Sequence, residues 1–215
     1  MFNPHDRILF IGDSITDAFR KPEEINIAYQ LGAGYALLIA AKYSLERPSD
    51  NLTFINRGIS GHGVIDLLHR WDTDCLALEP NVVSVLVGVN ECIRRFRGAE
   101  HLSIAEYEAQ YNFLLERTRQ CLPNVRLVVC EPFLLPCGEV TDEWIEDIKA
   151  RGEASRRVAE MQQSVFVPLQ RPFEEACALT PPEYWAYDGI HPTAAGFGLI
   201  ARQWIKHVEG SSVCL

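Results

Sequence analysis

The sequence lacks several features that would assign it to a specialised class of protein. No hydrophobic run approaches the roughly 18 residues that a membrane-spanning helix requires. No CxxC pair occurs, and the seven cysteines are an odd number, so neither a disulfide framework nor a zinc-ligand pattern is indicated. Internal repeats and low-complexity tracts are also missing. Membrane-spanning, disulfide-stapled and repeat proteins are therefore disfavoured.

Positive charge is also scarce. The chain has 20 Lys plus Arg against 29 Asp plus Glu, which gives a net charge of −9 at pH 7. Such a charge repels phosphate backbones and anionic membrane surfaces. The best basic stretch, Arg94, Arg95 and Arg97, is short and lies between Glu91 and Glu100, which is typical of a solvated loop. We expect neither nucleic acid nor a membrane as a partner.

The N-terminal segment carries no export signal. It has no basic region, no long apolar segment and no small-residue cleavage site before the first apolar run. The absence of cysteine pairing patterns favours reduced thiols, as in a reducing compartment. We expect a soluble, cytoplasmic protein.

Length and composition favour one globular domain. The chain has 215 residues, of which 47% are hydrophobic and 23% are charged, close to the averages of soluble globular proteins. At this size folding removes roughly 70% of the unfolded chain's surface from water, so no structural metal is needed for stability. We expect a single domain over residues 1–215.

Short apolar runs alternate with longer segments of helical periodicity, which is the pattern of βα units around a parallel sheet. The expected strands are residues 7–11, 52–56, 81–88, 125–131 and 165–168. The expected helices are residues 33–45, 64–71, 103–121, 141–163, 172–179 and 193–208. A capping box of Ser103 and Glu106 begins the third of them. The pattern predicts an α/β fold, a three-layer α/β/α sandwich with a central parallel sheet of about five strands.

The carboxyl ends of three expected strands combine glycine with small polar residues. These clusters are residues 12–16, 56–61 and 88–90, and in an open α/β sheet such ends meet at the ligand-binding edge. Ser14 follows a buried strand and a glycine, so it is a candidate nucleophile, although taken alone it would be interpreted as a helix N-cap. A serine needs a general base to attack a carbonyl group.

The segment from Tyr187 to Pro192 supplies a base and a residue to orient it. Asp188 and His191 are three residues apart in an expected turn, so the carboxylate can accept a hydrogen bond from one ring nitrogen and leave the other for Ser14. Three donors follow the carboxyl ends of the expected strands. They are the backbone amides of Ser14 and Gly61 and the side-chain amide of Asn90, and they are candidate donors to an oxyanion.

These residues resemble the GDSL lipase/esterase superfamily, also called SGNH hydrolases, in four ordered motif blocks. Residues 12–16 resemble the nucleophile block with Ser14, and residues 56–61 resemble the second block with Gly61 as an oxyanion donor. Residues 88–91 resemble the third block with Asn90 as the side-chain donor. Residues 188–192 resemble the last block, in which Asp188 and His191 complete a triad. The resemblance extends from residue 7 to about residue 205 and implies the flavodoxin-like fold of this superfamily.

Two positions depart from the superfamily pattern. Ile15 stands where the family's name has Leu, and Glu91 stands where Asp often follows the third-block Asn, which bears on the packing of that loop. The sequence around the motif blocks is most similar to that of intracellular bacterial acetylxylan esterases. This similarity implies a small ester substrate, an acetylated saccharide, and points to a homo-oligomer.

The resulting hypothesis is a serine esterase that hydrolyses short acyl esters, chiefly acetyl groups on sugars, without a metal or organic cofactor. The residues interpreted as shaping the substrate site are Asp13, Tyr187 and Trp185. Asp13 is expected to do so by accepting hydrogen bonds from backbone N–H groups near the turn. One alternative is a lysophospholipase or thioesterase that takes longer acyl chains. Another is a carbohydrate-binding domain without turnover. A phosphatase that uses Asp13 is disfavoured because Asp13 is not part of a DxD pattern.

Overall fold

A parallel sheet of five strands runs through the centre of the protein. The structure is a computed structural model that describes residues 2–210. The strands are β1 (Arg7–Gly12), β2 (Thr53–Gly58), β3 (Val82–Leu86), β4 (Arg126–Cys130) and β5 (Val165–Val167). They lie in the order β2-β1-β3-β4-β5, and every neighbouring pair is parallel. The chain therefore reverses its direction of winding across β1 and β3, the place where α/β sheets bind ligands.

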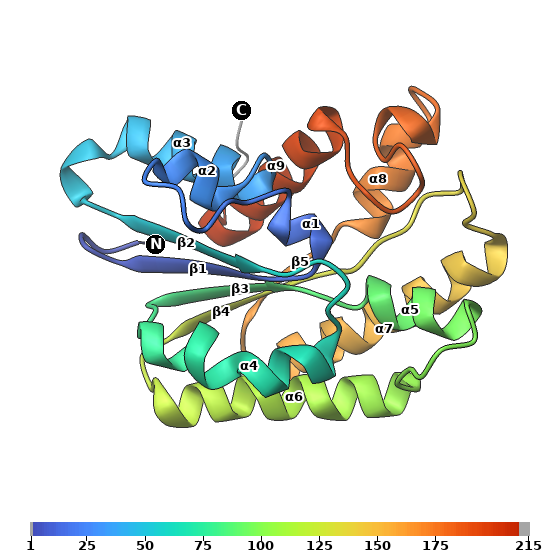
Figure 1. Ribbon diagram of the computed structural model, residues 1–215, viewed down its shortest axis with the longest axis horizontal. Helices are drawn as coiled ribbons and strands as arrows, with labels where there is room; N and C mark the ends of the chain where they lie inside the picture. The colour runs from blue at the N-terminus through green and yellow to red at the C-terminus, as the bar shows by residue number, and fades with distance from the viewer. Residues whose placement is uncertain (1, 211–215) are drawn as a thin grey trace.

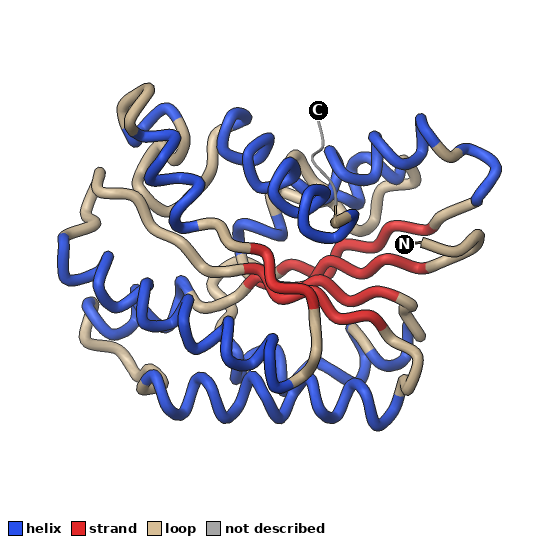
Figure 2. Tube along the Cα trace, turned by 180° about the vertical axis from the view of Figure 1, so that it is seen from behind, coloured by secondary structure: helices blue, strands red, loops and turns tan. Residues whose placement is uncertain are grey.

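Helices cover both faces of this sheet, as Figures 1 and 2 show. In Figure 1 the layer above the sheet holds α1, α2, α3, α8 and α9, and the layer below it holds α4, α5, α6 and α7. The bounds are α1 (Ser14–Asp17), α2 (Ile27–Leu31), α3 (Tyr35–Glu46), α4 (Val64–Asp74), α5 (Val89–Phe96), α6 (Ile104–Cys121), α7 (Asp142–Met161), α8 (Gln170–Cys177) and α9 (Ala194–Glu209). The predicted three-layer α/β/α architecture is confirmed.

Alternating side chains of the strands build one hydrophobic core on each face. Ile8 and Phe10 of β1 pack into the core that contains α3 and α9, whereas Leu9 and Ile11 pack into the core that contains α4 and α6. All four side chains are fully buried. This is why the strand is continuously apolar in sequence, since both of its faces are covered.

Three short helices were not among the elements expected from the sequence. They are α1, α2 and α5. The basic stretch from Arg94 to Arg97 was expected to be a solvated loop, but Arg94 and Arg95 lie in the last turn of α5. Arg94 pairs with Asp66, and Arg95 pairs with Asp147. Cations in the last turn of a helix interact favourably with its dipole, so this placement needs no nucleic-acid partner.

The carboxyl ends of β1 and β2 lie very close to α1. An added Cβ atom at Gly58, the last residue of β2, would lie 2.1 Å from the Asp17 backbone nitrogen and 2.6 Å from the Thr16 carbonyl carbon. Only glycine allows this approach of two backbones. The nucleophile segment is thereby packed directly against the end of the neighbouring strand.

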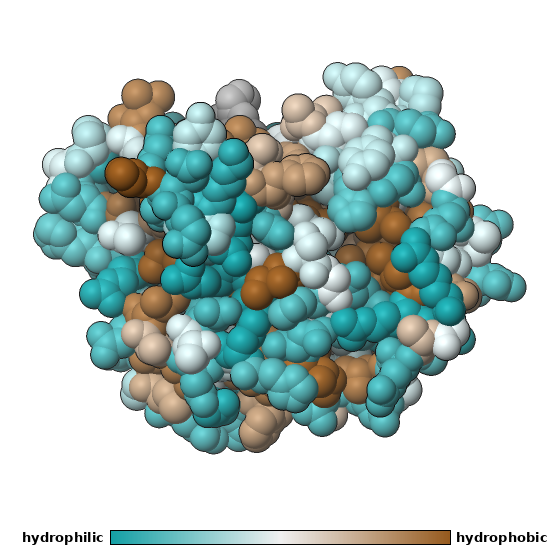
Figure 3. Space-filling model, viewed as in Figure 1, coloured by the Kyte–Doolittle hydropathy of each residue, from teal (hydrophilic) through white to brown (hydrophobic). Residues whose placement is uncertain are grey.

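The face of the molecule shown in Figure 3 is mainly hydrophilic, and its hydrophobic areas are small and separate. Among residues 2–210, no helix has both the length and the apolar character that crossing a bilayer would require.

Candidate active site

Ser14 is the first residue of α1, a single helical turn that begins directly after β1. Asp13 precedes it as the N-cap and accepts a hydrogen bond from the Ile15 backbone N–H at 2.9 Å. The helix cap is therefore Asp13, not Ser14. This leaves the Ser14 hydroxyl available for contacts outside the helix.

Asp188 and His191 lie in the loop between α8 and α9. One Asp188 oxygen, Oδ1, accepts from the backbone N–H groups of Ile190 at 3.0 Å and His191 at 2.7 Å. The other, Oδ2, lies 2.7 Å from Nδ1 of the His191 ring. Partial burial alone would raise the pKa of Asp188, but these hydrogen bonds hold it below its ordinary value. Asp188 is therefore a carboxylate fixed against one edge of the imidazole.

The opposite edge of the His191 ring faces Ser14. The Ser14 Oγ atom lies 3.0 Å from His191 Nε2, although 177 residues separate them in sequence. The structure thus brings Ser14, His191 and Asp188 into one continuous hydrogen-bonded chain. A proton on Ser14 can pass directly to Nε2, and the resulting imidazolium would lie against a carboxylate.

Gly61 lies in the loop after β2, and Asn90 is the second residue of α5; hydrogen bonds join these two segments. Gly61 follows β2 and has a positive φ of 83°, a conformation that favours glycine. Its carbonyl oxygen accepts from Arg94 at 2.8 Å. The Asn90 side-chain amide donates to the carbonyl oxygen of His62 at 3.0 Å, so it is tied to the Gly61 loop. An amide group carries two N–H donors, which leaves one for another acceptor.

Glu91, the next residue of α5, contacts the end of the loop that contains Gly61. Its side chain is buried, and Oε1 accepts from the Val64 backbone N–H at 2.6 Å at the start of α4. An added Cβ atom at Gly63 would lie 2.4 Å from that oxygen, so a glycine is needed there. Burial raises the pKa of Glu91, against the opposing effect of its backbone hydrogen bonds. Glu91, which stands where the superfamily often has Asp, therefore places a buried carboxyl group against the start of α4.

Two residues have positioning roles that the sequence reasoning did not assign, although Asn56 belongs to the second motif block. The Asn56 amide donates to the carbonyls of Thr16 at 2.6 Å and Leu31 at 2.8 Å, and so ties the end of β2 to α1. Arg70 of α4 donates to the carbonyls of Gly12 at 3.1 Å and Arg57 at 2.7 Å. These contacts join segments far apart in sequence. The polar residue type was the only signal for Arg70, whereas Asn56 also lies in the second motif block.

A cavity of about 190 Å³ opens beside Ser14. It is lined by Ser14, Ala18, Phe19, Ser60, Tyr187, His191, Pro192 and Phe197. Tyr187, predicted to shape the substrate site, lines this cavity. Asp13 and Trp185 do not, within the described residues. Asp13 is buried and accepts the bond from Ile15 N–H, while the half-buried Trp185 packs against Tyr184 with ring centroids 5.1 Å apart.

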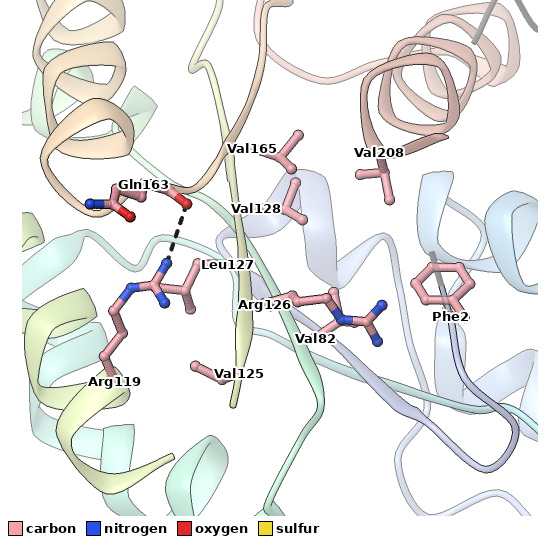
Figure 4. Close-up of a pocket in the computed structure, with 10 residues that line it drawn as sticks. All are labelled: Phe2, Val82, Arg119, Val125, Arg126, Leu127, Val128, Gln163, Val165 and Val208. Atoms are coloured by element: carbon pink, nitrogen blue, oxygen red, sulfur yellow. Dashed lines mark hydrogen bonds between the residues drawn. The ribbon is translucent and has the colours of Figure 1, made fainter. Parts of the chain in front are cut away.

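A second cavity, of about 280 Å³, lies at the amino ends of β3 and β4 (Figure 4). Its lining includes Phe2, Val82, Val128, Val165 and the side chain of Arg119, and none of its lining residues is a serine, histidine or carboxylate. Arg119 is occupied by the carbonyl oxygens of residues 162 and 163. This cavity therefore offers no nucleophile or base.

No metal-binding arrangement accompanies the candidate site. Among the side chains of residues 2–210, no three His, Cys, Asp or Glu residues are grouped so that they could hold a metal ion. Cys92, close to Asn90 in sequence, is fully buried in the core, as expected for a small apolar side chain.

The fold and the site define a class of protein. Residues 10–199 match the GDSL-like Lipase/Acylhydrolase family, and the chain belongs to that family. Its predicted place in the GDSL/SGNH superfamily is confirmed, and the chain is a carboxylic ester hydrolase.

Particular relatives resemble the chain over nearly its whole length. It is 32% identical to an acetylxylan esterase from Geobacillus stearothermophilus over 208 residues, which is 94% of each protein. A crystal structure of an acetylxylan esterase from that organism has a TM-score of 0.88 and 31% identity, covering 99% of this chain and 98% of the other. A structure of a GDSL-like lipase from Parabacteroides merdae has a TM-score of 0.94 and 34% identity, with 98% and 99% coverage.

Proposed function

We propose that the protein is a serine esterase that removes acetyl groups from saccharides, with Ser14, His191 and Asp188 as its catalytic triad. The observation that carries this proposal is the chain of contacts from Ser14 Oγ through the His191 ring to Asp188, at 3.0 Å and 2.7 Å. Both distances are within hydrogen-bond reach, as nucleophilic catalysis by serine requires.

The mechanism follows from these positions. His191 Nε2 takes the proton of Ser14 as the hydroxyl oxygen attacks the ester carbonyl. The oxyanion that forms accepts hydrogen bonds from the Ser14 and Gly61 amides and the Asn90 side chain. His191 then gives the proton to the departing alcohol, which leaves Ser14 acylated. Water, activated by the same ring, attacks the acyl-enzyme and releases the acid.

The size of the cavity supports a short acyl group. At about 190 Å³ it is smaller than the roughly 300–1,000 Å³ pockets that enclose drug-sized ligands. An acetyl group fits such a space, whereas a long acyl chain would extend into water. This favours acetyl esters over the long-chain esters of a lysophospholipase.

Relatives support the same assignment. One relative is an acetylxylan esterase, and a solved variant of that protein is described as an acetyl-xylooligosaccharide esterase. Two other solved variants, in which alanine replaces a serine and an aspartate, are described as catalytic mutants. The same two residue types occupy the ends of the hydrogen-bonded chain here.

The test compares wild type, Ser14→Ala and Ser44→Ala on p-nitrophenyl acetate, p-nitrophenyl octanoate and acetylated xylo-oligosaccharides. Ser44 is exposed on α3 and does not line the cavity beside Ser14, so it is the matched control. We expect Ser14→Ala to lower kcat by at least about 10³-fold, because the nucleophile is lost. Ser44→Ala should match wild type.

The substrate series tests the rest of the proposal. Wild type should prefer acetate to octanoate steeply and should release acetate from the oligosaccharides. Equal rates in wild type and Ser14→Ala would disprove the triad. Saccharide binding by calorimetry without any release of acetate would favour a carbohydrate-binding domain instead.

A further inference from the structure

Phe19 is the most unusual residue near the candidate active site. Its side chain is 86% exposed, and its φ is 60°. Ala18, directly before it, also has a positive φ of 45°. A left-handed backbone is strained for a bulky residue, and strain of this kind is typical of functional sites.

The neighbouring residues hold this conformation. Ala18 is buried, its N–H donates to the Ser14 carbonyl at 2.9 Å, and its carbonyl accepts from the Ala33 N–H at 2.7 Å. On the other side, the Arg20 guanidinium donates to the Gly58 carbonyl at 2.7 Å. Phe19 therefore lies between two anchored residues. The fold fixes its position, yet gains almost no buried area from its ring.

Phe19 and Tyr187 line the same cavity as Ser14. Tyr187 is 59% exposed, and its ring stacks on that of His191, with centroids 5.9 Å apart and planes 17° from parallel. Two aromatic rings thus remain in water beside the nucleophile, one of them against the base. Exposed apolar surface that is concentrated at a cavity marks a binding site.

The chemistry of these rings selects the ligand. An aromatic face carries partial negative charge, so it attracts polarised C–H groups. A pyranose ring presents C–H groups on its faces and hydroxyl groups around its edge, which stay in water when the face stacks. Because both rings are largely exposed, they suit the alcohol half of the ester, which remains outside, better than a buried acyl chain.

We propose that Phe19 and Tyr187 form a platform for the sugar ring of the substrate, and that Phe19 is its main specificity-determining residue. This proposal rests on the proposed deacetylase function and adds the part of the substrate that the triad does not contact. The left-handed turn at Ala18 and Phe19 then has a role, since it presents the phenyl ring to the substrate.

The test uses Phe19→Ala, Phe19→Trp and Ile25→Ala. Ile25 is 99% exposed on the same segment and does not line the cavity, so it is the matched control. Each variant is assayed on acetylated xylobiose and on ethyl acetate, whose alcohol has no pyranose face to stack on the two rings. The molar mass of each variant is measured by size-exclusion chromatography with light scattering.

We expect Phe19→Ala to lower kcat/KM for acetylated xylobiose by about 10-fold, mainly through KM, and to change ethyl acetate less than 2-fold. Phe19→Trp should restore saccharide activity, and Ile25→Ala should match wild type. An equal loss on both esters, or no loss on either, would overturn the platform. So would a changed molar mass with unchanged kinetics, which would assign Phe19 to a contact between copies of the chain. If the wild-type protein is inactive on acetylated xylobiose, the proposed deacetylase function is itself wrong. That outcome is seen with the wild type alone, so it is distinguishable from a failure of the platform.

Discussion

His191 can act as a base only if its ring is held in one tautomer and one orientation. Asp188 provides both, because one of its oxygens faces Nδ1 of the ring while the other accepts the His191 backbone N–H. The ring and its own backbone are therefore fixed by a single carboxylate. Nε2 is left as the acceptor that faces Ser14.

This geometry predicts the effect of Asp188→Asn. An amide that directs its nitrogen at Nδ1 favours the tautomer with the proton on Nε2, which cannot accept from Ser14. We expect kcat for p-nitrophenyl acetate to fall by about 10⁴-fold, with a much smaller change in KM. Asp72→Asn, an exposed aspartate on α4, is the control. Retention of a tenth or more of the activity would contradict the role of Asp188.

The residues of the candidate triad were predictable because each lies in a short motif with its own chemical meaning. Gly12, Asp13 and Ser14 are contiguous, and Asp188 and His191 are three residues apart. Phe19 was not predictable. Its exposure and its left-handed backbone depend on Ala33 and Gly58, which contact its neighbours from distant segments.

At the scale of elements, long helices were predicted well and short ones were missed. The predicted helix over 103–121 is α6 (Ile104–Cys121), since its 18 residues show several periods of apolar spacing. α1 has four residues and α2 has five, so neither completes enough turns to show a period. Such helices are held by caps and tertiary contacts instead of by an apolar face.

The capping box of α6 provides a prediction at this scale. Ser103 Oγ accepts from the Glu106 N–H at 3.3 Å, and the Glu106 carboxylate accepts from the Ser103 N–H at 2.9 Å. Replacing Ser103 with alanine removes one of these bonds. We expect Ser103→Ala to lower the free energy of unfolding by about 1 kcal/mol in urea denaturation, without a change in kcat.

Ser44→Ala is the matched control for that measurement. Ser44 is exposed inside α3, where alanine is the better helix former, so this variant should be as stable as wild type or slightly more stable. If Ser103→Ala and Ser44→Ala have the same denaturation midpoint, the capping box contributes nothing to stability.

At the scale of the whole molecule, acidic groups are placed in two different ways. Most lie at the surface, where ion pairs contribute little to stability. A few are buried, including Asp13, Glu91 and Glu131, and burial raises the pKa of each. The overall charge of −9 was readable from the sequence, but the burial of these carboxyl groups was not. The burial of these carboxyl groups arises because segments that are far apart along the chain pack against one another.

Asp13 makes the stability of the whole fold depend on pH. Burial raises its pKa from 3.8 to about 7, the Ile15 N–H opposes this shift, and the nearby Glu91 charge adds to it. Between pH 4 and 7 the native protein therefore holds a proton that the unfolded chain has released. The stabilisation is fully present below pH 4 and is lost as pH rises through about 7.

Asp13→Asn tests this linkage, because the amide keeps an oxygen acceptor for Ile15 N–H but cannot ionise. Urea unfolding of both proteins is measured at about pH 5 and at about pH 8.5. We expect wild type to lose on the order of 2 kcal/mol more than the variant between these conditions. Glu91→Gln, which keeps an acceptor for Val64 N–H, should move the wild-type loss to lower pH, since removing the neighbouring charge eases the ionisation of Asp13. Parallel pH profiles in wild type and Asp13→Asn would mean that Asp13 titrates at its ordinary pKa in the folded protein.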